Sequence, residues 1–225
     1  MTERVDIEKR AAAMKAAELV EDHMIIGLGT GSTVYYFIKE LEARIRNGLH
    51  LSCIPTSEAS RDLAEKSGIK VLKSIDRELD LDVDGADEVD SMGNLIKGGG
   101  GALTREKIVA ASSRKVCIII DSAKYHPEGL GKFKIPVEVL PFMVESTIMR
   151  IEKIGGKVFL RGNGDFRTDN GNPILDCDFG IIHDPGETER KLKMIPGVLE
   201  VGIFHSMADL VLMGVGNSAK TLFQK

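Results

Sequence analysis

The stretch from Asp82 to Lys107 concentrates residues that can do chemistry: DVDGADEVDSMGNLIKGGGGALTREK. It contains several carboxylates, a lysine, four consecutive glycines and Glu106, which lies early in a predicted helix. Carboxylates can transfer protons, and a lysine beside uncovered backbone N–H groups can stabilise a developing negative charge. This combination favours a reaction centre over a site that only binds a ligand.

The acidic part of this stretch brackets a predicted turn at Gly85, with Asp84 before it and Asp87 after it. An EF-hand has its glycine at the sixth position of the loop, whereas Gly85 is the fourth residue here, so calcium is disfavoured. A magnesium site stays open, and so does an Asx-type turn with solvated acids. We favour a functional role for Asp84 and Asp87, and the solvated turn for Glu88 and Asp90.

Lys97 precedes four consecutive glycines: Gly98, Gly99, Gly100 and Gly101. Glycine disfavours order, so such a run indicates a backbone that comes close to a ligand. Its N–H groups, at the start of a helix, could form an oxyanion hole to which Lys97 adds positive charge. A flexible linker is the alternative, and the helix that follows at once argues against it. Taken alone, Glu106 is explained by the favourable helix dipole.

The segment Gly27–Thr33 (GLGTGST) follows a predicted strand and opens a predicted helix. Backbone N–H groups at such a start bind phosphate, and the Ser32 and Thr33 hydroxyls could assist. A Rossmann fingerprint would need glycine at position 32, and a P-loop would need a lysine, so neither motif is present. A tight turn with an ordinary N-cap remains an alternative. Lys124, just beyond another strand, should reach the same sheet edge, although a surface lysine is the commoner explanation.

These motifs lie where predicted strands end and helices begin. Strands are predicted at 24–28, 51–55, 69–72, 79–83, 115–121 and 208–215. Helices are predicted from an N-cap at Asp6 to about residue 21, from 34 to a stop at Gly48, from a cap at Thr56 or Ser57 to a stop at Gly68, and over 102–112. Strands alternating with helices predict an α/β fold, Rossmann-like, with a mostly parallel sheet covered on both faces. Such sheets bind ligands at the carboxyl ends of their strands.

The section from residue 133 to 204 has a different pattern. Predicted strands at 135–139, 157–161, 173–179 and 198–204 alternate with helices at 142–154 and 185–195, and Asn170-Gly171 is a hairpin signal. This order is that of a ferredoxin-like unit. We therefore predict an α/β catalytic domain at 1–132 and 205–225, with a small α+β lid or oligomerisation domain inserted at 133–204. The tail after Gly216 suggests no function.

Composition excludes several classes of protein. The chain has 225 residues, 43% of them hydrophobic, and a net charge of −4 with both signs interleaved, which argues against disorder and against nucleic acid as the main ligand. No apolar run is long enough to cross a membrane, so we expect a cytoplasmic protein. Cys53, Cys117 and Cys177 are far apart and should be reduced core thiols. The five histidines lack zinc spacing, and no G-x-S-x-G suggests a hydrolase.

Six blocks taken together resemble type A ribose-5-phosphate isomerases: GLGTGST, DVDGADE, IKGGGGALTREK, DSAKYHPEGLGKFKIPVEVLP, TDNGN and IPGVLEVGIF. The blocks keep the order of that family and cover nearly the whole chain. The resemblance implies interconversion of ribose 5-phosphate and ribulose 5-phosphate through an enediolate. It further implies that no metal or cofactor takes part, and that the protein is a homodimer or homotetramer.

The resemblance also assigns roles. Glu106 would be the general base, Lys97 and the glycine loop would stabilise the enediolate, and Asp84 and Asp87 would bind sugar hydroxyls, shuttle protons and assist ring opening. Burial could give Glu106 the basicity that this task needs. The substrate-binding residues would be Thr30, Gly31, Ser32, Thr33, Gly85, Ala86, Gly98, Gly99, Gly100, Lys124 and Lys9. For the lysine on the first helix, Arg10 and Lys15 remain alternatives to Lys9.

Two other functions are compatible with parts of the pattern. Acyl-CoA transfer shares this general architecture and uses a glutamate as a covalent nucleophile. A sugar-phosphate sensor domain of a regulator would bind the same ligand without turnover. Such regulators usually carry a DNA-binding segment, and the first predicted helix leads directly into a strand with no helix-turn-helix before it.

Overall fold

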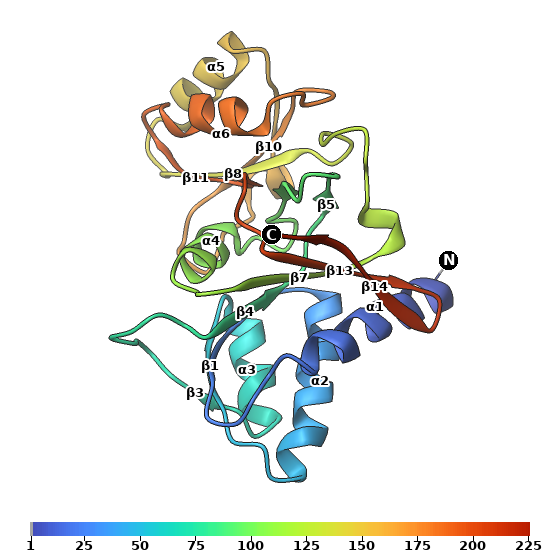
Figure 1. The fold of residues 1–225 in the computed structure, drawn as a ribbon. Coiled ribbons are helices and arrows are strands. Elements are labelled where there is room, and N and C mark those ends of the chain that lie inside the picture. The colour runs from blue at the N-terminus through green and yellow to red at the C-terminus, as the bar shows by residue number, and fades with distance from the viewer. Residues whose placement is uncertain (1) are drawn as a thin grey trace. The chain divides into compact units, whose positions relative to one another are not determined.

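The structure is a computed structural model that describes residues 2–225, and its fold is drawn in Figure 1. The chain divides into two units. The first contains the residues up to Ala86, Arg105–Tyr125 and Met207–Lys225, and the second contains Asp87–Thr104 and His126–Ser206. This division differs from the boundaries expected at 132/133 and 204/205, because residues 87–104, 126–132 and 205–206 also belong to the second unit. The role of that unit as a lid or in oligomerisation stays a prediction.

The first unit is built on a seven-stranded sheet of order β14-β13-β7-β4-β1-β2-β3. Its strands are β1 (Ile25–Leu28), β2 (Ser52–Pro55), β3 (Lys70–Val71), β4 (Leu81–Asp84), β7 (Val116–Asp121), β13 (Leu210–Val215) and β14 (Ser218–Gln224). Every neighbouring pair is parallel except β13 with β14. The predicted α/β class with a mostly parallel sheet is confirmed, and the six predicted strands of this sheet all appear in it.

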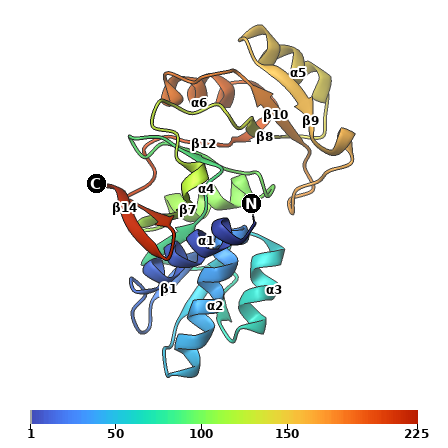
Figure 2. The same cartoon turned by 90° about the vertical axis from the view of Figure 1, so that its right-hand side faces the viewer.

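Helices cover both faces of this sheet. The helices α1 (Thr2–Ala17), α2 (Ser32–Arg46) and α3 (Glu58–Lys66) lie on one face, and α4 (Leu103–Ala111) lies on the other (Figure 1). Figure 2 shows α1 and α2 side by side against the sheet. The buried residues of α2 are Thr33, Val34, Phe37, Ile38 and Leu41, which is the spacing of one helical face. This face and the alanines of α1 form the core of the unit with the strands.

The first helix packs more closely and begins earlier than the sequence indicates. A Cβ at Gly214 of β13 would lie 1.9 Å from the backbone oxygen of Glu8 on α1, so only glycine allows this approach. The helix begins at Thr2, and the predicted N-cap at Asp6 is wrong. The preceding residues include the good helix formers Glu3 and Arg4, which extend the helix by one turn.

Other helix ends agree with the sequence. Ser57 is the N-cap of α3, and its hydroxyl accepts a hydrogen bond from the Ser60 N–H at 3.1 Å. Gly48 and Gly68 follow the ends of α2 and α3 with φ of 99° and 78°, a conformation that favours glycine. These predicted signals are confirmed, so the local sequence is enough to end these helices.

The second unit contains a four-stranded antiparallel sheet of order β11-β8-β10-β9. Its elements are β8 (Ile135–Val139), α5 (Val144–Lys153), β9 (Lys157–Leu160), a short 3₁₀ segment η2 (Arg161–Gly164), β10 (Ile174–Asp178), α6 (Pro185–Lys193) and β11 (Val198–Val201). Ile151 of α5 and Leu192 of α6 are buried with Val137 and Cys177 of the sheet. The order of elements and of strands is that of a split βαβ unit.

A second small sheet in this unit was not predicted. It has the order β12-β6-β5, from β5 (Glu88–Val89), β6 (Leu95–Ile96) and β12 (Ile203–Phe204). The predicted strand 198–204 is therefore two strands in different sheets, separated at Gly202. A Cβ at Gly202 would lie 2.4 Å from the Lys97 backbone oxygen, and the Gly202 carbonyl accepts a hydrogen bond from the Lys97 N–H at 2.8 Å. This close crossing requires glycine and cannot be read from hydrophobic periodicity.

One further prediction needed correction, and one strand lies in a segment for which no structure was predicted. The turn at Asn170-Gly171 does not join β9 to β10 as a two-residue hairpin, because it lies in a longer connection that includes η2. The tail after Gly216 forms β14, an edge strand whose residues are mostly exposed and therefore show little hydrophobic pattern. Over residues 2–225, none of the helices combines the length and the apolar character that a membrane crossing requires.

The three cysteines lie in the cores, as expected. Burial raises the pKa of Cys53, Cys117 and Cys177 to about 12 each, so the thiols are protonated and unreactive at neutral pH.

Candidate active site

Asp84 is the last residue of β4 and is buried, with 1% of its surface exposed. Its Oδ1 atom accepts hydrogen bonds from the N–H groups of Thr30 at 3.0 Å and Gly85 at 2.7 Å, which fixes the carboxylate at the carboxyl end of the sheet. A Cβ at Gly29 would lie 2.0 Å from Asp84 Cγ, so Gly29 is needed for this approach. Sequence reasoning missed Gly29, although the G-x-G spacing pointed to it.

The loop before α2 is held by a cluster of hydroxyls. Thr30 Oγ1 lies 2.8 Å from both Thr56 Oγ1 and Ser57 Oγ, and Ser60 Oγ donates to the Gly29 carbonyl at 2.7 Å. The Thr30 hydroxyl therefore holds the loop in place, and the Thr30 N–H donates to Asp84. The first N–H groups of α2, from Ser32 on, have no acceptor within a helix and remain the candidates for holding an anion.

Two neighbours on α1 connect to this region of the first unit. Lys9 Nζ donates to Ser32 Oγ at 2.9 Å, at the start of α2. Glu8 accepts from the N–H and hydroxyl of Ser122 at 3.0 and 2.6 Å, at the start of the 3₁₀ segment η1 (Ser122–Lys124) that follows β7. Lys124, half-buried, ends that segment. Lys9 thus contacts the start of α2, whereas Arg10 lies over the Tyr36 ring and Lys15 pairs with Glu18.

Glu106 lies in the first turn of α4 and is 3% exposed. A glutamate that only favoured the helix dipole would stay in water, since a buried charge loses its hydration. Glu106 is therefore not a solvated glutamate at a helix start. Three of the site residues predicted in the first unit are buried: Thr33, Asp84 and Glu106.

In the second unit, Asp87 and the glycine loop are bonded to each other. Asp87 Oδ2 accepts a hydrogen bond from the Gly99 N–H at 2.7 Å, and a Cβ at Gly99 would lie 2.6 Å from Asp87 Oδ1. Gly98 and Gly101 have φ of 97° and 84°, and the Gly101 N–H closes a turn onto the Gly98 carbonyl at 2.9 Å. The loop is thus an ordered turn that requires glycine at three positions, and the alternative of a flexible linker is not supported.

Lys97 precedes this turn and is 3% exposed. Its Nζ lies 5.4 Å from the centre of the Phe204 ring, which places a cation near an aromatic face in the same unit. A lysine with so little access to water keeps its position with little loss of entropy on binding. The buried position therefore suits a fixed electrostatic role.

The solvated turn expected for Glu88 and Asp90 is only partly right. Glu88 is 1% exposed and accepts from the N–H groups of Gly131 at 2.6 Å and Phe133 at 2.5 Å. Asp90 is 6% exposed and forms an Asx-type turn with the Met92 N–H at 2.9 Å. Both acids have structural roles, as predicted, but they are buried rather than solvated. The backbone partners of Asp90 are local, whereas those of Glu88 lie 43 and 45 positions along the chain and cannot be seen in the sequence.

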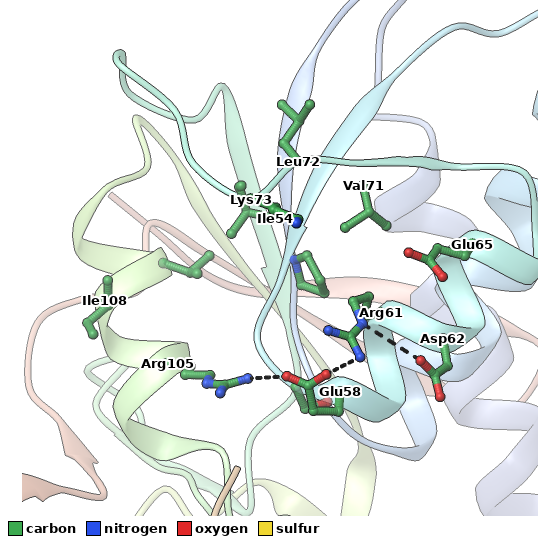
Figure 3. Close-up of a pocket in the computed structure, with 13 residues that line it drawn as sticks. Ile54, Glu58, Arg61, Asp62, Glu65, Val71, Leu72, Lys73, Arg105 and Ile108 are labelled. Atoms are coloured by element: carbon green, nitrogen blue, oxygen red, sulfur yellow. Dashed lines mark hydrogen bonds and ion pairs between the residues drawn. The ribbon is translucent and has the colours of Figure 1, made fainter. Parts of the chain in front are cut away.

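A separate pocket of about 600 Å³ lies in the first unit between α3 and α4 (Figure 3). None of the predicted site residues lines it. Arg105 and Arg61 both pair with Glu58, the former at 3.0 Å, and Arg61 Nε is 3.7 Å from Asp62. Its lining has three basic side chains, including Lys73, and three acidic ones, including Glu65, so this pocket lacks the excess positive charge that a phosphate ester needs. Within residues 2–225 no group of three His, Cys, Asp or Glu side chains is arranged to hold a metal ion.

Comparison with known proteins agrees with these features. The family model described as "Ribose 5-phosphate isomerase A (phosphoriboisomerase A)" matches residues 52–218. A ribose-5-phosphate isomerase A from Picrophilus torridus is 51% identical over 207 residues, covering 92% of this chain and 93% of that protein. Both sequences therefore align over nearly their full lengths.

Solved structures show the same fold. The ribose 5-phosphate isomerase A of Methanocaldococcus jannaschii superposes with a TM-score of 0.90 at 41% identity, covering 96% of this chain and 98% of that one. A D-ribose-5-phosphate isomerase in complex with phospho-erythronic acid gives a TM-score of 0.93 at 39% identity, covering 98% of this chain and 99% of that one. The chain belongs to the ribose-5-phosphate isomerase A family.

Proposed function

We propose that the protein interconverts D-ribose 5-phosphate and D-ribulose 5-phosphate. Family membership carries this proposal, because relatives that match almost the whole chain bear the name of that activity. The complex of one matched structure with phospho-erythronic acid, a phosphorylated sugar acid, supports a sugar phosphate as the substrate. A cytoplasmic location and a homodimer or homotetramer belong to the same proposal.

Glu106 is the proposed general base. It removes the proton from C2 of the open-chain aldose, the electrons of the C–H bond form a C1–C2 double bond, and O1 becomes the enediolate oxygen. The O2 proton is then transferred to O1, the C2 carbonyl forms as the C1–C2 double bond gives up its electrons, and Glu106 returns its proton to C1. Burial of Glu106 at 3% exposure supports this role, because a desolvated carboxylate is a stronger base than a solvated one.

Lys97 and the glycine turn are the proposed stabilisers of the enediolate. The negative oxygen needs donors that are already in position when the charge develops. The ordered turn at 98–101 and the buried Lys97 support this assignment, since the turn is held by its own hydrogen bonds and Lys97 lies beside Phe204. A charged donor forms a stronger hydrogen bond to such an oxygen than a neutral donor does, which is why a lysine suits this role.

Asp84 and Asp87 are proposed to bind the sugar hydroxyls and to move protons between O1 and O2. Each has one oxygen held by backbone N–H groups, Asp84 by Thr30 and Gly85, and Asp87 by Gly99. Such bonds fix a carboxylate without neutralising it. The phosphate is proposed to bind at the start of α2, at Gly31, Ser32 and Thr33, with Lys9 and Lys124.

The test is to incubate EDTA-treated protein with ribose 5-phosphate in deuterium oxide and to follow the products by proton NMR. We expect ribulose 5-phosphate to form with solvent deuterium in the product, because the base exchanges its proton with solvent. Binding without turnover would contradict the proposal and favour a sensor. Formation of a hydroxylamine-trappable acyl intermediate after addition of acyl-CoA would favour the transferase alternative.

Glu106→Gln tests the base directly. We expect turnover to fall by at least about 10²-fold, with binding of an unreactive phosphate ester retained, because only the proton transfer is lost. Glu145→Gln is the matched control, since Glu145 also lies in the first turn of a helix, α5, but is exposed. Unchanged turnover in Glu106→Gln, measured by single-turnover kinetics, would remove Glu106 from the mechanism.

A further inference from the structure

Arg161, the first residue of η2, is bonded to two backbone carbonyls of the glycine turn within the second unit. Its Nη1 atom donates to the carbonyl oxygens of Gly98 at 2.9 Å and Gly99 at 3.2 Å. No motif of the sequence marks this residue, and the proposed mechanism does not use it. The two bonds join the segment between β9 and β10 to the glycine turn, which we propose stabilises the enediolate.

The guanidinium is itself held firmly. Asp176 of β10 accepts from Arg161 Nε at 3.0 Å and from Nη2 at 2.5 Å, which is the two-bond geometry of an arginine–carboxylate pair. The Arg161 side chain is 14% exposed and that of Asp176 is 21% exposed, so water screens the pair only partly. The Phe166 ring lies 5.4 Å from the guanidinium carbon. Arg161 therefore reaches the turn from a fixed position on the sheet.

Arg161 and Asp87 bind the same peptide group, Arg161 at its carbonyl and Asp87 at its N–H. In a trans peptide the carbonyl and the N–H point in opposite directions. Arg161 binds the carbonyl of Gly98, and the N–H of the same peptide, from Gly99, donates to Asp87 Oδ2 at 2.7 Å. Arg161 therefore fixes the orientation of this peptide, and the peptide in turn positions the Asp87 carboxylate.

The next peptide is oriented in the same way. Its carbonyl, from Gly99, also accepts from Arg161, so the N–H of Gly100 points away from the guanidinium. The Phe166 ring also lies close to the turn, because a Cβ at Gly101 would lie 2.5 Å from it. Since glycine peptides rotate easily, a turn of four glycines would not keep one orientation without such partners.

We infer that Arg161, fixed by Asp176, is a positioning residue that orients the glycine turn and the Asp87 carboxylate for the reaction. This inference rests on the proposed isomerase function. Arg161 acts through the Gly98–Gly99 peptide and is not proposed to touch the substrate. Its loss should lower the rate of the chemical step, because a shift of the donors by about 1 Å costs roughly 10²-fold in rate.

The experiment measures kcat and KM of Arg161→Ala with ribose 5-phosphate, together with the thermal midpoint of unfolding. We expect kcat to fall by about 10- to 100-fold, with KM changed by less than about threefold, because the proposed phosphate site lies in other residues. Arg161→Lys should have an intermediate kcat, because an ammonium can pair with Asp176 but lacks the planar fork. Arg190→Ala is the control, since Arg190 pairs with Glu187 on the exposed face of α6.

A double-mutant cycle separates positioning from a general loss of stability. If Arg161 acts through Asp87, the loss in Arg161→Ala/Asp87→Ala should be smaller than the product of the two single losses. If the wild-type protein is active, a fully active Arg161→Ala variant would overturn this inference but not the proposed function. A double variant whose loss equals the product of the two single losses would do the same. A wild-type protein that does not turn over ribose 5-phosphate would instead overturn the proposed function.

Discussion

At the scale of single residues, the buried acids of this protein differ by the partners that surround them. Glu138 is fully buried and accepts hydrogen bonds from Thr104, Thr168, Asn170 and Asn172. The TDNGN segment therefore supplies the donors that allow a carboxylate to be buried in the second unit. Donors of this kind identify a structural acid, and they explain why the segment carries so many polar side chains.

Glu8 is a structural acid whose role depends on pH. Burial would raise its pKa, but hydrogen bonds from the Ser122 side chain and backbone, Arg4 and the Gly216 backbone outweigh this and lower the pKa of Glu8 from 4.5 to about 2. Since the folded value lies below the unfolded one, the ionised carboxylate stabilises the fold fully above the unfolded value, and this contribution is lost as the pH falls toward the folded value.

We predict that Glu8→Gln lowers the free energy of unfolding by about 1–3 kcal/mol at neutral pH, because a charged hydrogen-bond acceptor is lost. The difference from wild type should shrink as the pH falls from 4.5 to about 2, where Glu8 itself becomes protonated. Urea unfolding at neutral and acidic pH checks this. Glu3→Gln, an exposed change on the same helix, is the control. A difference that stays constant with pH would contradict the assignment.

At the scale of elements, the glycine turn is as specific as a helix or strand. Gly98 and Gly101 adopt positive φ, and Gly99 leaves no room for a Cβ beside Asp87. Leu103 and Pro136 lie 2.8 and 3.3 Å from a Cβ placed at Gly98, so both space and conformation select glycine there. The run of four glycines therefore reflects separate constraints at individual positions.

We predict that Gly99→Ala lowers kcat/KM by about 10- to 100-fold, because the methyl group must displace the Asp87 carboxylate. The thermal midpoint should change little, since Gly99 itself is exposed. Gly216→Ala is the control, because its φ is 55° and a Cβ there would meet nothing within 4 Å. This control should lose about 1 kcal/mol of stability and keep its activity. Full activity of Gly99→Ala in steady-state assays would contradict the role of the turn.

At the scale of the whole molecule, each unit is assembled from separate parts of the chain. Residues 87–104 belong to the second unit although both flanking segments belong to the first. In that unit, Ile96 of β6 pairs with Ile203 of β12, and Glu88 accepts from the Phe133 N–H. A cut at the boundaries expected from the sequence would leave these groups without their partners.

We predict that replacing residues 133–204 by a Gly/Ser linker gives a poorly folded protein, because buried Ile96 and Leu130 become exposed. Replacing both 87–104 and 126–206 by linkers should leave a first unit with a cooperative thermal transition, since its own core is kept. Binding of a hydrophobic dye and calorimetry compare the two variants. A cooperative transition and no dye binding in the first variant would support the boundaries at 132/133 and 204/205 instead.

The sequence by itself determined the elements whose signals are local. The apolar face of α2, the Ser57 cap and the glycines after α2 and α3 depend on neighbouring residues, so periodicity and capping rules predict them. The parallel sheet followed from strands alternating with helices, and the strand ends then indicated where Asp84 and the loop before α2 would lie.

Tertiary structure decided the features that depend on distant partners. The edge strand β14 forms because β13 offers an unpaired edge, and the split at Gly202 arises where the chain crosses Lys97. The bonds of Asp87 with Gly99 and of Arg161 with the glycine turn join residues 12 to 63 positions apart. Such pairs leave no periodic signal in the chain, because their energy comes from contacts that exist only after folding.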